Sequence, residues 1–224
     1  MSALRKAWAL AAKDLLVELH TWEMVSAMLV FAVLALFVFS FALDLHGAVA
    51  RAAAPGVLWS AVVLSGTLGL SRSMAREQQA RCIDGLRLAP MDPAVIWGGK
   101  ALGALLVMVV VEAVLLPLMV MLFDVPLLRP GVLWVLVLGT LGYAAVGTLV
   151  AAMAVNTRAR EVLLPVLLLP LAVPVLIAAV RATGALVEGA APAEVAGWTR
   201  LLVAYDLVMV AVCLLTFGYV VEEG

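Results

Sequence analysis

Long hydrophobic runs alternate with short polar segments along the chain. Six runs are close to the roughly 20 residues that a helix needs to cross a bilayer. They cover residues 24–43, 55–74, 101–123, 131–155, 162–180 and 200–220. This pattern predicts an all-α integral membrane protein with six transmembrane helices in one domain, residues 1–224. The pair Pro55-Gly56 is typical of a helix start, so the second helix is predicted to begin there.

Residues 3–20 have an amphipathic pattern instead. Apolar residues recur every three or four positions, and Lys6, Lys13 and His20 fall on the opposite face. Such a helix is expected to lie in the membrane–water interface, with its cations in water. A helix that packs against the cytoplasmic side of the protein is the alternative interpretation.

The segment 75–99 is the longest polar interruption and separates the second and third runs. Its charged residues are Arg76, Glu77, Arg81, Asp84 and Arg87. Since charges cannot remain in hydrocarbon, the segment is predicted to be a loop in water, and a loop of this length usually has a function. We interpret it as the docking site of a cytoplasmic partner. A basic loop held near anionic lipid is the alternative.

The distribution of Lys and Arg predicts the orientation. With six spans, the fourteen cations divide into ten on the side of the N-terminus and four on the other side. Cytoplasmic loops carry the excess of Lys and Arg, so both termini and the 75–99 loop are predicted to be cytoplasmic.

Two acidic residues and three prolines stand out inside the runs. Glu112 falls near the middle of the third run, where a carboxyl must be neutral or paired. It either lines a substrate path or a partner contact, or forms a hydrogen bond to a neighbouring helix. Asp206 is expected near the outer end of the sixth run, as a cap or a buried hydrogen-bond partner. Pro165, Pro170 and Pro174 should bend or break the fifth helix, as a hinge, a cavity wall or a packing shape.

Composition narrows the functional classes. The chain is 66% hydrophobic and 13% charged, against about half and a quarter in globular domains. It contains no Walker A motif, GxSxG, HExxH or phosphate-binding glycine loop, so we expect no enzyme activity and no nucleic-acid binding. His20 and His46 fall at opposite ends of the first span, so neither a metal site nor a haem ligand pair is expected.

Five segments in order resemble the haem exporter protein B family, the permease subunit of the bacterial cytochrome c maturation ABC transporter. They are KDLLVELHTWE at 13–23, APGVLWSAVVLSGTLGLSRSM at 54–74, DGLRLAPMDPAVIWGGK at 84–100, VLLPVLLLPLAVPVLIAA at 162–179 and LLVAYDLVM at 201–209. The resemblance implies a six-span, type-2 exporter-like permease in the bacterial inner membrane. It also implies an N-terminal interfacial helix and a coupling helix between spans two and three.

The same resemblance implies the partners. They are a cytoplasmic ATPase subunit, a haem-handling membrane subunit, a small single-span subunit and, indirectly, the periplasmic haem chaperone. ATP and haem would be handled by partners, with no cofactor on this chain. The family pattern maps Arg76, Glu77, Arg81 and Asp84 onto the ATPase contact, with Arg87 close behind. Alternatives are a six-span exporter of lipid, glycan or drug, an ion-coupled carrier that uses Glu112, and a structural assembly subunit.

Overall fold

The computed structural model describes residues 3–42, 47–79, 92–154, 157 and 160–223. These residues form helices and connecting turns, without strands. The helices are α1 (Ala3–Thr21), α2 (Glu23–Ala42), α3 (Gly47–Gln79), α5 (Pro93–Phe123), α6 (Pro130–Ala154), α7 (Arg160–Glu188) and α8 (Pro192–Glu223).

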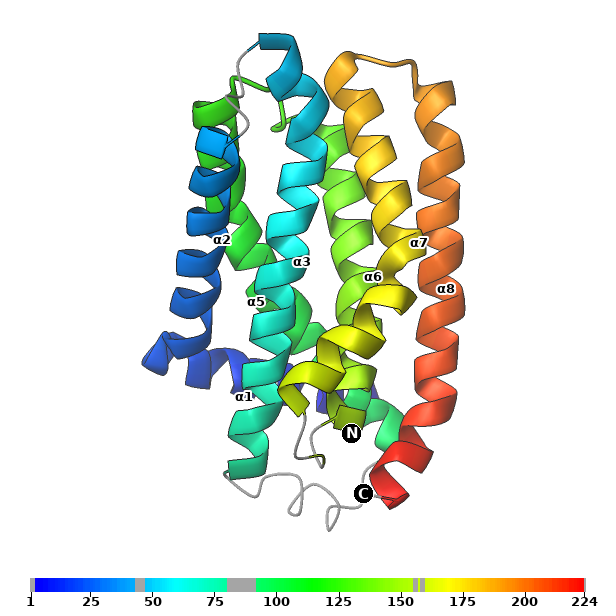
Figure 1. The fold of residues 1–224 in the computed structure, drawn as a ribbon. Helices are drawn as coiled ribbons and strands as arrows, with labels where there is room; N and C mark the ends of the chain where they lie inside the picture. The colour runs from blue at the N-terminus through cyan, green and yellow to red at the C-terminus, as the bar shows by residue number, and fades with distance from the viewer. Residues whose placement is uncertain (1–2, 43–46, 80–91, 155–156, 158–159, 224) are drawn as a thin grey trace.

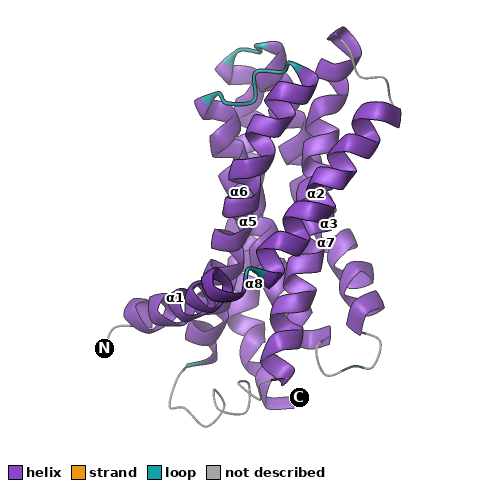
Figure 2. Ribbon diagram, turned by 90° about the vertical axis from the view of Figure 1, so that its left-hand side faces the viewer, coloured by secondary structure: helices purple, strands orange, loops and turns teal. Residues whose placement is uncertain are grey.

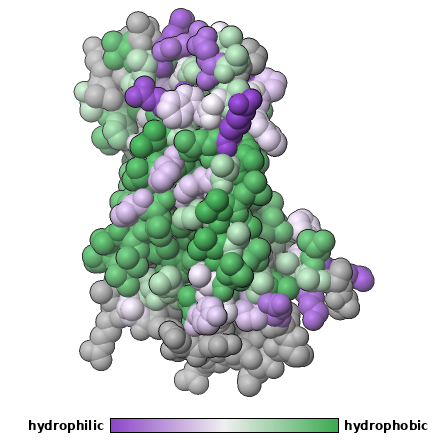
Figure 3. All heavy atoms as spheres, turned by 90° about the vertical axis from the view of Figure 1, so that its right-hand side faces the viewer, coloured by the Kyte–Doolittle hydropathy of each residue, from purple (hydrophilic) through white to green (hydrophobic). Residues whose placement is uncertain are grey.

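Six of these helices, α2 to α8, are long and apolar enough to cross a membrane. Figure 3 shows the expected surface, a broad hydrophobic band with hydrophilic side chains gathered at its two ends. The predicted class, an all-α multi-pass membrane protein with six spans, is confirmed.

The helix α1 does not run with the bundle. It lies across one end of it and projects sideways (Figures 1 and 2). The start of α1, the end of α3, the start of α5 and the end of α8 all lie at this end (Figure 1), which we call the α1 end. The turn from α1 into α2 passes through Trp22, whose φ of 52° is in the left-handed region. A bulky residue rarely adopts this conformation, and here it makes the sharp change of direction.

The centre of the bundle is α6, which packs against α3, α5, α7 and α8. Three of its glycines lie directly against side chains of other helices. A Cβ at Gly139 would overlap Trp59, a Cβ at Gly142 would overlap Asp206, and a Cβ at Gly147 would overlap Leu70. Small residues allow helices to approach closely in membranes. At these glycines α3 and α8 therefore come into close contact with α6.

Two helices begin earlier than the hydrophobic runs suggest. The helix α5 begins at Pro93 rather than near residue 101, because Asp92 is its N-cap and accepts a hydrogen bond from the Ala94 amide at 2.9 Å. The helix α3 begins at Gly47, so the start predicted at Pro55-Gly56 is wrong and Pro55 lies inside the helix. The segment 47–54, before Pro55, is rich in alanine, which favours helix. It is too short to form a long apolar run, so the hydrophobic pattern did not include it.

The proline-containing helix α7 is bent but continuous from Arg160 to Glu188 (Figure 1). Close to Pro170, the Tyr205 hydroxyl of α8 donates a hydrogen bond to the carbonyl of Leu171 at 2.7 Å. A side chain of the neighbouring helix therefore donates to a backbone carbonyl in the proline-rich stretch. Inside a membrane such carbonyls need a partner within the protein, because no water is present.

Candidate functional site

Glu18 is the central residue of the α1 end. Its side chain is buried, 2% exposed. Oε1 accepts hydrogen bonds from the backbone amides of Met24 and Val25, both at 2.8 Å. These amides belong to the first turn of α2, where backbone donors have no partner within the helix. Glu18 of α1 therefore caps the N-terminus of α2.

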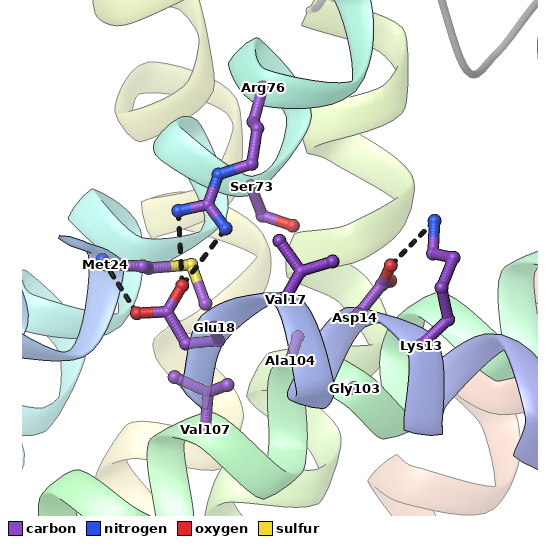
Figure 4. A pocket seen from close by; sticks show the side chains of 10 residues that line it. All are labelled: Lys13, Asp14, Val17, Glu18, Met24, Ser73, Arg76, Gly103, Ala104 and Val107. Atoms are coloured by element: carbon purple, nitrogen blue, oxygen red, sulfur yellow. Dashed lines mark hydrogen bonds and ion pairs between the residues drawn. The ribbon is translucent and has the colours of Figure 1, made fainter. Parts of the chain in front are cut away.

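The other carboxylate oxygen of Glu18 binds α3. Nη1 and Nη2 of Arg76 both donate to Oε2 at 3.1 Å (Figure 4). Glu23 lies farther from the same guanidinium, at 3.8 Å. Because Arg76 is near the last turn of α3, one buried carboxylate joins α1, α2 and the end of α3. We call this arrangement the Glu18 junction.

A second ion pair joins α1 to α5. Nζ of Lys100 lies 2.7 Å from Oδ2 of Asp14, and the Lys100 side chain is only 5% exposed. Lys13 contacts the other oxygen of Asp14 at 2.9 Å. Nearby, α1 lies directly against Gly99 and Gly103 of α5. Two glycines four residues apart allow this close approach, so α1 is held by both packing and charge.

The predicted docking residues are only partly described. Arg76 binds Glu18 and Glu23 within this chain. The side chain of Glu77, and Arg81, Asp84 and Arg87 altogether, lie outside the described residues. Of the predicted coupling segment 75–99, residues 75–79 belong to α3 and residues 93–99 to α5, whereas residues 80–91 lie outside the described residues. Their contact with an ATPase stays a prediction.

Sequence reasoning did not identify Glu18, Asp14 or Lys100 as site residues. One signal was available, since Asp14 and Glu18 are four residues apart and fall on one helix face. The Gly99-x-x-x-Gly103 spacing was another. Neither signal names the partner cations, because these are far away in sequence.

In the membrane interior, Glu112 of α5 accepts a hydrogen bond from the Thr140 hydroxyl of α6 at 2.5 Å, through Oε1. The side chain is 2% exposed, and Oε2 has no hydrogen-bond partner among the described residues. Of the two roles considered for Glu112, the bond to a neighbouring helix is the one that this geometry supports.

Asp206 lies halfway along the span Ala193–Val220 rather than near its outer end. The expected position within the helix is wrong because α8 already begins at Pro192 rather than near residue 200. Its carboxyl is 5% exposed and lies against Gly142 of α6. Both oxygens lack a hydrogen-bond partner in the described part of the chain.

The two interior carboxyls do not form a common site. Glu112 meets α6 at Thr140 and Asp206 meets it at Gly142. Two residues apart on a helix means about 200° around its axis. The carboxyls therefore lie on opposite sides of α6, which argues against a shared cation site.

Replacing Glu112 with Gln is expected to be nearly neutral. The amide oxygen still accepts from Thr140, and no buried charge is created, so the free energy of unfolding should change by less than about 1 kcal/mol. Detergent-titrated unfolding of Glu112→Gln, compared with the wild type, measures the change. A clear loss of stability would contradict the role of Glu112 as an acceptor for Thr140.

His20 and the other possible metal ligands are scattered. The His20 Nδ1 lies 3.0 Å from the Leu16 carbonyl of its own helix. In the described residues, no three His, Cys, Asp or Glu side chains gather as a metal site would require.

Comparison with known proteins identifies the family of the chain. A family model described as CcmB protein matches residues 5–223. Heme exporter protein B of Rhodobacter capsulatus is 30% identical over 172 residues, which cover 75% of this chain and 78% of that protein. Heme exporter protein B of Paracoccus denitrificans is 34% identical over 142 residues, 62% of this chain and 64% of that protein. The chain, a six-span membrane protein with a transverse N-terminal helix, belongs to the CcmB protein family.

Proposed function

We propose that this chain is the transmembrane permease subunit of an ABC transporter for cytochrome c maturation. It would couple ATP hydrolysis by a partner to haem delivery or to release of the haem-loaded periplasmic chaperone. Family membership supports the haem-related role, since both relatives are named heme exporter protein B. The observation that supports coupling is the Glu18 junction, which links the end of α3 to α1 and α2.

The junction gives a direct route for movement. The predicted coupling segment 75–99 begins within the end of α3, whose last residue is Gln79. Arg76 lies one turn before that end and is bound to Glu18. Displacement of the end of α3 by a docked partner would therefore reach the first turn of α2 through a single side chain.

The proposed partners are a cytoplasmic ATPase subunit, a haem-handling membrane subunit and a small single-span subunit. This chain would hold neither ATP nor haem itself and would catalyse no reaction. In the proposed orientation the α1 end faces the cytoplasm of a bacterial inner membrane, in line with the excess of Lys and Arg in the segments at that end.

Charge reversal in the predicted coupling segment tests the proposal. The double variant Glu77→Lys/Asp84→Lys should lose ATPase co-purification, or keep it but lose cytochrome c assembly, with normal membrane insertion. Interface charges of alternating sign fix register and exclude wrong partners, so reversing them is disruptive. Affinity purification from the native membrane, with mass spectrometry and a haem spectrum, measures the result.

The matched control is Glu188→Lys/Glu194→Lys, two exposed reversals at the opposite end of the bundle, which should leave partners and assembly unchanged. Normal ATPase co-purification and normal assembly in the Glu77→Lys/Asp84→Lys variant would contradict the coupling role. A stoichiometric haem band on the isolated chain would contradict the assignment of haem to a partner.

A further inference from the structure

A pocket of about 170 Å³ opens at the α1 end, between α1, α2, α3 and α5 (Figure 4). One part of its wall is polar, formed by Lys13, Asp14, Glu18, Ser73 and Arg76. The other part is apolar and mostly small, formed by Val17, Met24, Gly103, Ala104 and Val107. In Figure 4 the Lys13–Asp14 pair and the Arg76–Glu18 pair lie on either side of Val17.

The charges around the pocket balance. Its wall has two cations and two carboxylates, and just behind the wall Lys100 binds Asp14 and Glu23 lies near Arg76. Attraction of anionic lipid requires clusters of Lys and Arg without such compensation. The two cations remain partly open, because the side chains of Lys13 and Arg76 are 46% and 30% exposed. A ligand with one positive and one negative group matches this wall better than an anion does.

An apolar crevice continues from the pocket into the bundle, between α2, α3 and α5. It shares Met24, Ser73, Ala104 and Val107 with the pocket. Farther in, Met28 packs onto Gly69 and Met108 packs onto Gly66. The crevice itself holds only about 10 Å³ of empty space, but methionine side chains are flexible and readily make room for an apolar chain.

Size also restricts the occupant. Pockets for compact organic ligands usually hold about 300–1,000 Å³, so the space of about 170 Å³ suits a small polar group and not a macrocycle such as haem. Its position, where a transverse amphipathic helix meets the spans, is where lipid headgroups lie.

We propose that this pocket binds the phosphoethanolamine headgroup of a phospholipid. The phosphate contacts Lys13 and Arg76, and the ammonium group contacts Asp14, whose side chain is 24% exposed. One acyl chain follows the methionine-lined crevice. A primary ammonium can donate a hydrogen bond to this carboxylate, whereas the quaternary ammonium of phosphocholine has no N–H to donate. This inference does not depend on the proposed transport function.

Lipid retention by the full-length chain tests the proposal. The protein is purified in detergent, stripped of lipid and mixed with dioleoyl phosphatidylethanolamine, phosphatidylcholine or phosphatidylglycerol, and bound lipid is counted by native mass spectrometry. Phosphatidylethanolamine should be retained about fivefold more than either of the others, and Lys13→Gln should weaken its retention about fivefold.

A variant that fills the pocket provides a second test of the proposal. Ala104→Leu occupies the shared wall of pocket and crevice without changing a charge, and should lower phosphatidylethanolamine retention to the level of phosphatidylcholine. Ala113→Leu, at an exposed position of the same helix, should change nothing. If Ala104→Leu fails to fold by size exclusion and circular dichroism, Lys13→Gln decides alone.

Equal retention of the three lipids would overturn the proposal. Preference for phosphatidylglycerol would also overturn it and would indicate a general basic surface. Unchanged retention in a folded Ala104→Leu variant would place the lipid elsewhere. Displacement of bound phosphatidylethanolamine by added haem at equal concentration would overturn the assignment to a headgroup.

Discussion

Glu18→Ala is expected to lower the free energy of unfolding by about 2–4 kcal/mol, because the substitution removes both hydrogen bonds from Arg76, whose side chain is 30% exposed. It also removes the acceptor of the Met24 and Val25 amides, which then have no side-chain cap. Both losses occur at the same place, where three helices meet. Unfolding by SDS titration, followed by tryptophan fluorescence, measures the change.

Glu18→Gln separates the two contributions. A glutamine oxygen can still accept from both amides of α2, whereas the charge that binds Arg76 is lost. Its destabilisation should therefore be smaller than that of the alanine variant by about 1–2 kcal/mol, the typical effect of a lost N-cap. Equal effects of the two variants would show that the cap contributes nothing. A wild-type midpoint for Glu18→Ala would rule out the Glu18 junction as a stabilising contact.

Gly139→Ala is the second large effect that we expect. A Cβ at this position would overlap the indole ring of Trp59, which is 2% exposed and donates a hydrogen bond from Nε1 to Thr183 at 3.1 Å. A rigid ring held on α3 by α7 cannot move aside cheaply. Overpacking of this kind costs about 1–3 kcal/mol, and the same SDS titration should detect it.

Gly56→Ala is the matched control, since a Cβ there meets nothing within 4 Å. Alanine is the better helix former, so this variant should be about 0.5–1 kcal/mol more stable than the wild type. A shorter side chain opposite Gly139, as in Gly139→Ala/Trp59→Leu, should recover part of the loss. If Gly139→Ala is as stable as Gly56→Ala, then α3 and α6 do not approach as closely as described.

The Glu18 junction and the Gly139 contact differ in how much of each could be predicted from the sequence. From the sequence alone, Gly139, Gly142 and Gly147 indicate close helix contact in the fourth run, because small residues let helices approach closely in membranes. Trp59 as the partner of Gly139 could not be read from the sequence, since the two belong to different helices. For Glu18, the sequence indicates only the helix face on which the residue lies. Its three partners could not be predicted, because they belong to α2 and α3.

The sequence by itself determined the class of the protein and its number of spans, because the length and hydropathy of a run decide whether a helix can cross a bilayer. It also placed Glu112 within its span and indicated the family. Tertiary structure alone decided that Asp206 lies halfway along its helix and that Arg76 binds α1. It also decided that α1, α2, α3 and α5 enclose a charge-balanced pocket. Helix extensions at Gly47, Pro93 and Pro192 moved the boundaries, since capping and packing, rather than hydropathy, fix where a helix begins. Contacts between distant segments depend on how helices pack, and hydropathy along one chain carries no information about that.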